Sequence, residues 1–111
     1  MKNLVGKEIV VFNWVDSFHI AFDLYFFEGS RIRVRKETFW RLSHGDRIMI
    51  SAFSRKPEKN LSLMQNLLEG KTIQKMIERK NGDMVLYLNQ RTKLEVFNSD
   101  KRISPIEFCD L

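Results

Sequence analysis

The feature that most constrains the fold of this chain is an internal repeat. Residues 24–34 read Leu-Tyr-Phe-Phe-Glu-Gly-Ser-Arg-Ile-Arg-Val, and residues 86–96 read Leu-Tyr-Leu-Asn-Gln-Arg-Thr-Lys-Leu-Glu-Val. A leucine, a tyrosine, a basic residue, an aliphatic residue and a valine recur at an offset of 62 positions. A second pair of segments, 4–9 and 68–73, shares leucine, glycine, lysine and isoleucine at an offset of 64. The sequence therefore predicts two copies of one β unit, with halves at about residues 1–55 and 60–111.

The length of the chain indicates one domain, residues 1–111, because 111 residues bury one hydrophobic core but not two independent ones. A composition of 43% hydrophobic and 30% charged residues is typical of a folded soluble protein. The most apolar segment, 18–27, is far shorter than the roughly 20 residues of a membrane-spanning helix. The first eight residues lack the apolar stretch of a secretory signal. We therefore expect a cytoplasmic protein that does not insert into membranes, and we expect a monomer.

Hydrophobic alternation predicts strands along most of the chain. Segment 18–27 is apolar at every even position, which is typical of a strand with one buried face. Segment 8–15 is apolar on both parities, which predicts a central strand covered on both faces. Hairpin turns are predicted at 28–30 and at Asn81-Gly82. The eight predicted strands are residues 8–15, 18–27, 31–36, 47–53, 71–80, 83–88, 92–97 and 102–109.

Two short helices complete the prediction. Residues 37–42 have the pattern of a short helix, and a turn at 43–46 follows it. The polar segment 54–59 contains a proline, which argues against regular structure there. A second helix is expected at 61–69, with Asn60 as its N-cap. These elements define an α+β, mainly β fold, in which two antiparallel units form a sandwich or a half-open barrel.

Residues suited to catalysis or metal binding are few. His19 lies within a predicted strand and His44 within a predicted turn, and neither belongs to a motif that places two metal ligands on one face. The single cysteine, Cys109, excludes an intramolecular disulfide and a cysteine-based metal site. The glycines stand alone in turns and form no phosphate-binding loop. The sequence therefore predicts a protein that is not an enzyme, with no catalytic residues, no metal and no cofactor.

A row of basic side chains is the best candidate for a binding surface. Its members are Arg31, Arg33, Arg35 and Lys36. The three arginines alternate along one predicted strand, so they share one face of the sheet. Tyr25 and Phe27 lie across the hairpin and are available for stacking on a base. Three interpretations remain open for this face: solvation alone, a protein partner or a nucleic acid.

The two tryptophans have different predicted roles. Trp14 alternates with other apolar residues in segment 8–15, which predicts a core position. Trp40 stands beside Arg41 near the end of the predicted helix. An exposed tryptophan in that position would be an interface anchor, so we include Trp40 in the predicted partner-binding set.

The tandem arrangement resembles small bacterial immunity proteins. Each half begins with Leu-x-Gly-Lys-x-Ile, continues with a strand that contains Leu-Tyr, and turns into a basic residue followed by an aliphatic residue, one further residue and valine. The chain ends in an acidic and aromatic tail, Ile-Glu-Phe-Cys-Asp-Leu, at residues 106–111. Immunity proteins of this kind neutralise polymorphic toxins, including those of contact-dependent growth inhibition.

The resemblance implies a stoichiometric inhibitor without a cofactor, whose partner is the C-terminal domain of one cognate toxin. The net charge of +5 departs from the acidic character of many immunity proteins against nucleases. For a basic protein, attraction to an acidic toxin surface would accelerate association. The alternative function from another class is a small, sheet-based nucleic-acid-binding accessory protein.

Overall fold

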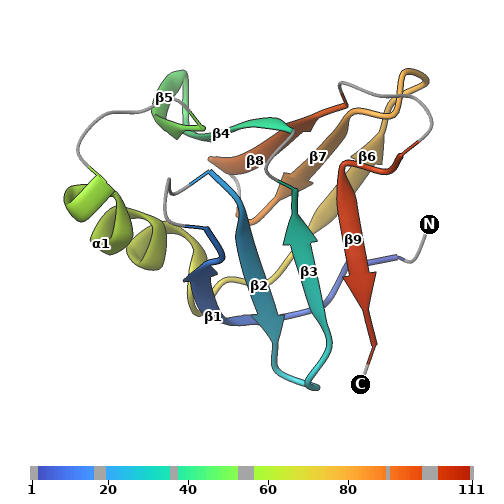
Figure 1. Ribbon diagram of the computed structural model, residues 1–111, viewed down its shortest axis with the longest axis horizontal. Helices are drawn as coiled ribbons and strands as arrows, with labels where there is room; N and C mark the ends of the chain where they lie inside the picture. The colour runs from blue at the N-terminus through green and yellow to red at the C-terminus, as the bar shows by residue number, and fades with distance from the viewer. Residues whose placement is uncertain are drawn as a thin grey trace.

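The computed structural model describes residues 3–16, 20–35, 38–52, 57–89, 91–98 and 103–110. In these ranges the chain forms nine strands and one helix (Figure 1). The elements are β1 (Ile9–Trp14), β2 (Phe22–Phe26), β3 (Arg31–Val34), β4 (Phe39–His44), β5 (Arg47–Ser51), α1 (Pro57–Leu68), β6 (Lys75–Glu78), β7 (Met84–Tyr87), β8 (Thr92–Phe97) and β9 (Ile106–Cys109).

The strands form two open antiparallel sheets. The first sheet has the order β1-β2-β3-β9, and the second has the order β5-β4-β8-β7-β6. Helix α1 lies beside β1 at one end of the molecule (Figure 1). Neither sheet closes into a barrel. The predicted α+β, mainly β class with two antiparallel sheets is therefore confirmed, and the open form is the sandwich rather than the half-open barrel.

Strand pairing is matched between the two halves of the chain. In the β2–β3 hairpin, Leu24 lies opposite Ile32. In the β7–β8 hairpin, the residues 62 positions later, Leu86 and Leu94, lie opposite each other. The strand that follows each hairpin pairs with the other half of the chain: β4 pairs with β8, and β9 pairs with β3. The halves are thus interlocked by an exchange of strands.

The shorter repeated segments pair with each other. The Gly6 N–H donates to the Ile73 carbonyl at 2.8 Å, and the Gly70 N–H donates to the Ile9 carbonyl at 2.7 Å. These bonds are equivalent at an offset of 64. Gly6 and Gly70 have φ values of 91° and 81°, which a residue with a Cβ rarely adopts. The two copies of the motif therefore meet around an approximate two-fold axis.

The core lies between the inner faces of the two sheets. Alternate positions of β2 and β3 are fully buried, as the period of two predicts. Helix α1 adds Met64 and Leu68, which are also fully buried. The largest fully buried side chains are Trp40, Phe22, Phe26, Leu4, Ile9, Leu24, Ile32, Leu42, Ile50, Met64, Leu68 and Ile73.

The helix predicted at 37–42 and the exposed position predicted for Trp40 are wrong. Residues 39–42 belong to strand β4, and Trp40 lies opposite Val96 with no exposed surface. Its indole Nε1 donates to the Ile20 carbonyl at 2.5 Å. In a strand, alternation turns Trp40 and Leu42 inward and Arg41 outward. Six residues are too few to separate this alternation from a helical stripe.

Four other predictions need correction. Strand β1 is an edge strand, not a central one, and Val10 and Val11 are 38% and 45% exposed beside an irregularity in its pairing with β2. Helix α1 begins at Pro57, a residue that suits the first turn, so Asn60 lies inside the helix. Strand β6 is shorter than predicted because the preceding residues pair with the segment at 6–9. Trp14, expected in the core, is half-buried and packs against the core.

Candidate functional site

The predicted arginine row lies on the outer face of the first sheet. The side chains of Arg31, Arg33 and Arg35 are 33%, 34% and 36% exposed. The residues between them, Ile32 and Val34, are buried and face the core. Tyr25 lies directly opposite Arg31 and is half-buried. Lys36, the fourth predicted member, lies outside the described residues.

A buried carboxylate holds the first two arginines. Arg33 donates from Nε to Oδ1 of Asp23 at 2.8 Å and from Nη2 to Oδ2 at 3.0 Å. Arg31 donates from Nη1 to the same Oδ2 at 3.1 Å. The Asp23 side chain is only 3% exposed. Hydrogen bonding to Asp23 raises the pKa of the Arg33 guanidinium, since the ion pair stabilises the charged form.

The pairing reduces the positive character of this face. Arg35 lies 3.7 Å from Glu107, so three guanidiniums share two carboxylates among the described residues. One unit of positive charge remains. Because Arg31 and Arg33 already donate to Asp23, they have fewer donors for a phosphate backbone. The arrangement is better suited to holding the sheet together and to weak electrostatic attraction than to gripping nucleic acid.

The structure separates the predicted partner-binding residues. Tyr25 and the three arginines share the outer face of the first sheet. Trp40 belongs to the core between the sheets and cannot contribute to that face. The described part of the predicted site is therefore the group around Asp23, without a tryptophan anchor.

The candidate catalytic residues do not form a reactive group in the described residues. His44 is exposed, and its Nδ1 lies 2.8 Å from Oγ1 of Thr92. His19 lies outside the described residues. In the ranges that the structure describes, no cluster of three or more histidine, cysteine or acidic side chains could hold a metal ion. Cys109 is half-buried at the end of β9.

One exposed aromatic residue, which the sequence predicts only as a stacking partner for a base, is also a candidate protein-interface anchor. Phe27 is 78% exposed at the β2–β3 turn. Its N–H donates to the Glu8 carbonyl at 2.9 Å, which fixes the turn against the segment before β1. A hollow of about 510 Å³ lies there, lined by Asn3, Val5, Gly6, Lys7, Glu8, Phe27 and Glu28. The parity of segment 18–27 contained the signal, because an odd position followed by a turn faces away from the core.

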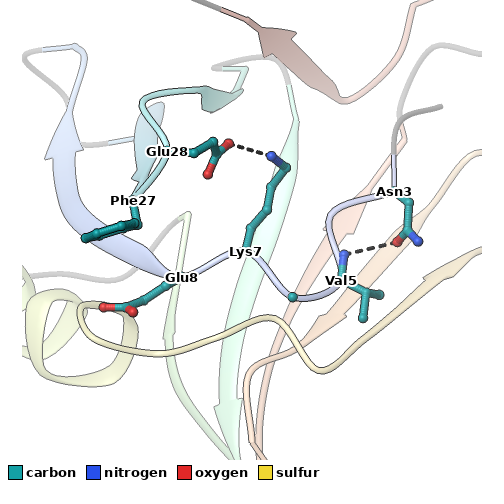
Figure 2. A pocket seen from close by; sticks show the side chains of 7 residues that line it. Asn3, Val5, Lys7, Glu8, Phe27 and Glu28 are labelled. Atoms are coloured by element: carbon teal, nitrogen blue, oxygen red, sulfur yellow. Dashed lines mark hydrogen bonds and ion pairs between the residues drawn. The ribbon is translucent and has the colours of Figure 1, made fainter.

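The rim of this hollow is held by an ion pair. Figure 2 shows Lys7 reaching from the N-terminal segment to Glu28 of the turn, and the two charged groups are 2.5 Å apart. The Phe27 ring extends away from this pair (Figure 2). Hydrogen bonds from Lys7 and then from Ser30 lower the pKa of Glu28 to about 2. The Phe27 anchor, as we call this exposed ring and its ion-paired rim, is thus built on two connected segments.

The fold and these surfaces define a mainly β protein with a partly charged outer face on its first sheet and an exposed aromatic anchor at the β2–β3 turn. Comparisons with protein-family models, with curated proteins and with solved structures give no match. Within the described ranges, no helix has the length and apolar character needed to cross a membrane.

Proposed function

We propose that this chain is an immunity protein, which binds the toxic C-terminal domain of a cognate toxin and protects the cell that makes both. The observation that carries the proposal is the Phe27 anchor on a sheet scaffold with matched halves. The resemblance of the tandem repeat to immunity proteins supplies the class of partner. The proposed action is stoichiometric binding, without a cofactor, in the cytoplasm.

The Phe27 anchor has the composition of a binding hot spot. Aromatic residues that are exposed in the free protein and buried in the complex contribute much of the affinity of protein interfaces, especially when polar groups surround them. Complete burial of a phenylalanine side chain contributes about 1.5–3 kcal/mol. The Lys7–Glu28 pair forms such a polar rim, and it fixes the turn before binding. A preformed turn reduces the entropy that is lost on association.

The charge on the outer face of the first sheet supports a second element of the proposal. In the ion pairs formed by the described residues, Arg31, Arg33 and Arg35 exceed their carboxylate partners by one positive charge. A modest positive potential accelerates association with an acidic toxin surface and contributes less to the final affinity. We therefore expect the association rate to fall as salt concentration rises, with a smaller change in the dissociation rate.

The direct test is rescue from the neighbouring toxin. The proposal predicts that a toxin is encoded immediately upstream of this chain's gene, and its C-terminal domain is expressed from an inducible promoter, alone and together with this chain. We expect growth arrest without the chain, normal growth with it, and a 1:1 complex in size-exclusion chromatography. Growth arrest that persists at equal expression, or a toxin domain that forms no complex, contradicts the proposal.

The role of the anchor has its own matched control. Phe27→Ala is expected to weaken the complex by at least about tenfold, since hot-spot truncations cost more than 1 kcal/mol. Ile48→Ala is the control, because Ile48 is 58% exposed on β5 of the other sheet. Equal affinities for the Phe27 variant and the wild type would remove the anchor from the interface while leaving the rescue result intact.

A further inference from the structure

A hollow on the second sheet collects positive charge without a matching number of carboxylates. It has a volume of about 350 Å³ and is lined by Gly45, Asp46, Tyr87, Arg91 and Lys93. Lys93 lies opposite Tyr87 across the β7–β8 hairpin. The Nζ of Lys75, on the neighbouring strand, lies 5.7 Å from the centre of the Tyr87 ring. Three cations and one carboxylate therefore surround the tyrosine.

The first half of the chain contains a corresponding hollow. It has a volume of about 290 Å³ and is lined by Tyr25, Gly29, Arg31, Cys109 and Asp110. Three lining residues of the two hollows correspond at the repeat offset of 62: Tyr25 and Tyr87, Gly29 and Arg91, Arg31 and Lys93. The two sites are copies of one arrangement, so their differences show what is particular to the second.

The main difference is the position of the buried carboxylate, which is Asp23 in the first half and Glu95, at the position of Arg33, in the second. In the first half, Asp23 accepts hydrogen bonds from Arg31 and Arg33. The corresponding position in the second half is Val85, which is buried and brings no charge. Lys93 lies 3.9 Å from the nearest oxygen of Glu95, at the limit of an ion pair.

Glu95 is already committed to another cation. Arg41 donates from Nε to Oε1 of Glu95 at 2.8 Å. The second hollow also has cations at two positions where the first half has none. Arg91 replaces Gly29 at the offset of 62, and Lys75 replaces Val11 at the offset of 64. Arg91, Lys75 and Lys93 are three positive charges, and Asp46 is one negative charge, so about two positive charges remain without a carboxylate partner among the described residues.

The backbone positions Arg91 at the mouth of the hollow. The N–H of Arg91 donates to Oδ1 of Asn89 at 2.8 Å, and the N–H of Thr92 donates to the same oxygen at 2.7 Å. The Arg91 carbonyl accepts the N–H of Gly45 at 2.7 Å. The guanidinium passes over Gly45, where Nη2 would lie 3.6 Å from a Cβ. Three hydrogen bonds thus fix the residue before any ligand arrives.

We propose that the Tyr87 hollow binds a phosphate group, either as the free ion or as a phosphomonoester. The excess of about two positive charges over carboxylates among the described residues matches a phosphate dianion better than a single carboxylate. The guanidinium, two ammonium groups and the tyrosine hydroxyl provide several donors for phosphate oxygens. This site is independent of the Phe27 anchor and of the proposed toxin partner.

The test is a ¹H–¹⁵N NMR titration of the full chain with sodium phosphate at about pH 8, where phosphate is largely dianionic. Sodium chloride at matched ionic strength and sodium acetate are the comparison salts. We expect saturable shifts at Gly45 and at residues 87–93, and no saturable shifts around Tyr25. A parallel titration with adenosine monophosphate distinguishes the sources, because tighter binding than inorganic phosphate identifies a phosphomonoester and equal binding identifies the free ion.

Variants connect the shifts to the cations. Arg91→Gln and Lys75→Gln are each expected to weaken phosphate binding by about tenfold, the typical effect of one charge-assisted hydrogen bond. Lys80→Gln is the matched control, since Lys80 is exposed in the turn at the opposite end of β7 and loses the same charge. The proposal is overturned by a titration without saturation, by acetate binding as tightly as phosphate, or by equal weakening in the Lys80 variant.

Discussion

Replacement of Asp23 by asparagine removes the buried negative charge that pairs with Arg31 and Arg33 on the outer face of the first sheet. The carboxylate is 3% exposed and accepts three hydrogen bonds from Arg31 and Arg33. Asparagine has the same shape, but it carries no charge and points an NH₂ group at a guanidinium. Loss of one partner from a fully buried ion pair costs about 3–5 kcal/mol. Because the guanidiniums are one-third exposed and regain water, we expect Asp23→Asn to cost about 2–3 kcal/mol.

The assay is urea denaturation followed by tryptophan fluorescence and far-ultraviolet circular dichroism. The control is Glu107→Gln, because Glu107 is 44% exposed and lies 3.7 Å from Arg35. Surface pairs of this kind contribute at most about 1 kcal/mol. A double-mutant cycle with Arg33→Gln isolates the pair, and we expect a coupling energy of about 1–2 kcal/mol. Equal losses for the Asp23 and Glu107 variants, with no coupling to Arg33, would refute the reasoning.

Three further predictions concern stability. The pKa of Glu28 is lowered to about 2 by Lys7 and Ser30, so its ion pair stabilises the fold above about pH 4.5 and the contribution is lost as pH falls towards 2. Glu28→Gln should therefore lower the free energy of unfolding, measured by urea denaturation, by about 0.5 kcal/mol at pH 7, as expected for a surface pair, and by less at pH 3. Trp40→Phe should lower the free energy of unfolding by about 2 kcal/mol in the same assay, because it removes the hydrogen bond to the Ile20 carbonyl and leaves a cavity. A loss below about 0.5 kcal/mol, which is typical of a surface substitution, contradicts the core position. Gly6→Ala and Gly70→Ala should each cost about 1–2 kcal/mol through their positive φ alone, since neither Cβ would meet an atom within 4 Å; unequal losses would argue against equivalent roles for the two motifs.

Local signals in the sequence were sufficient for the hairpins. The alternation at 22–26 predicts β2, and β8 has the bounds that the sequence predicts, 92–97. The turn glycines Gly29 and Gly82 have φ values of 102° and 92°, as a tight turn requires. These features depend on neighbours a few residues away, so the chain contains all the information that they need.

Features that depend on distant contacts were not predictable. Trp40 is buried because β8, more than fifty positions later, supplies the strand beside it. Strand β1 is apolar on both parities, yet no strand pairs with its outer edge in the described part of the chain, where segment 70–73 bonds to segment 6–9 and Glu69 accepts the Phe12 N–H. The arginine row was predicted on the correct face, but Asp23 beneath it looked like an ordinary polar position of a strand. Only the cross-strand register shows that Asp23 lies opposite Arg33.

Pairs of opposite charges across neighbouring strands favour the exchange of strands between the two halves. Arg33 lies opposite Glu107 in the β3–β9 pair, and Glu95 lies opposite Arg41 in the β8–β4 pair. If each half kept its own last strand in the same register, Arg41 would face Arg33 and Glu107 would face Glu95. Opposite charges across strands contribute about 0.2–1 kcal/mol, and like charges cost a similar amount. Two favourable pairs in place of two unfavourable ones differ by about 2 kcal/mol, so the reversed charges of the two copies favour the interlocked arrangement over two separate units.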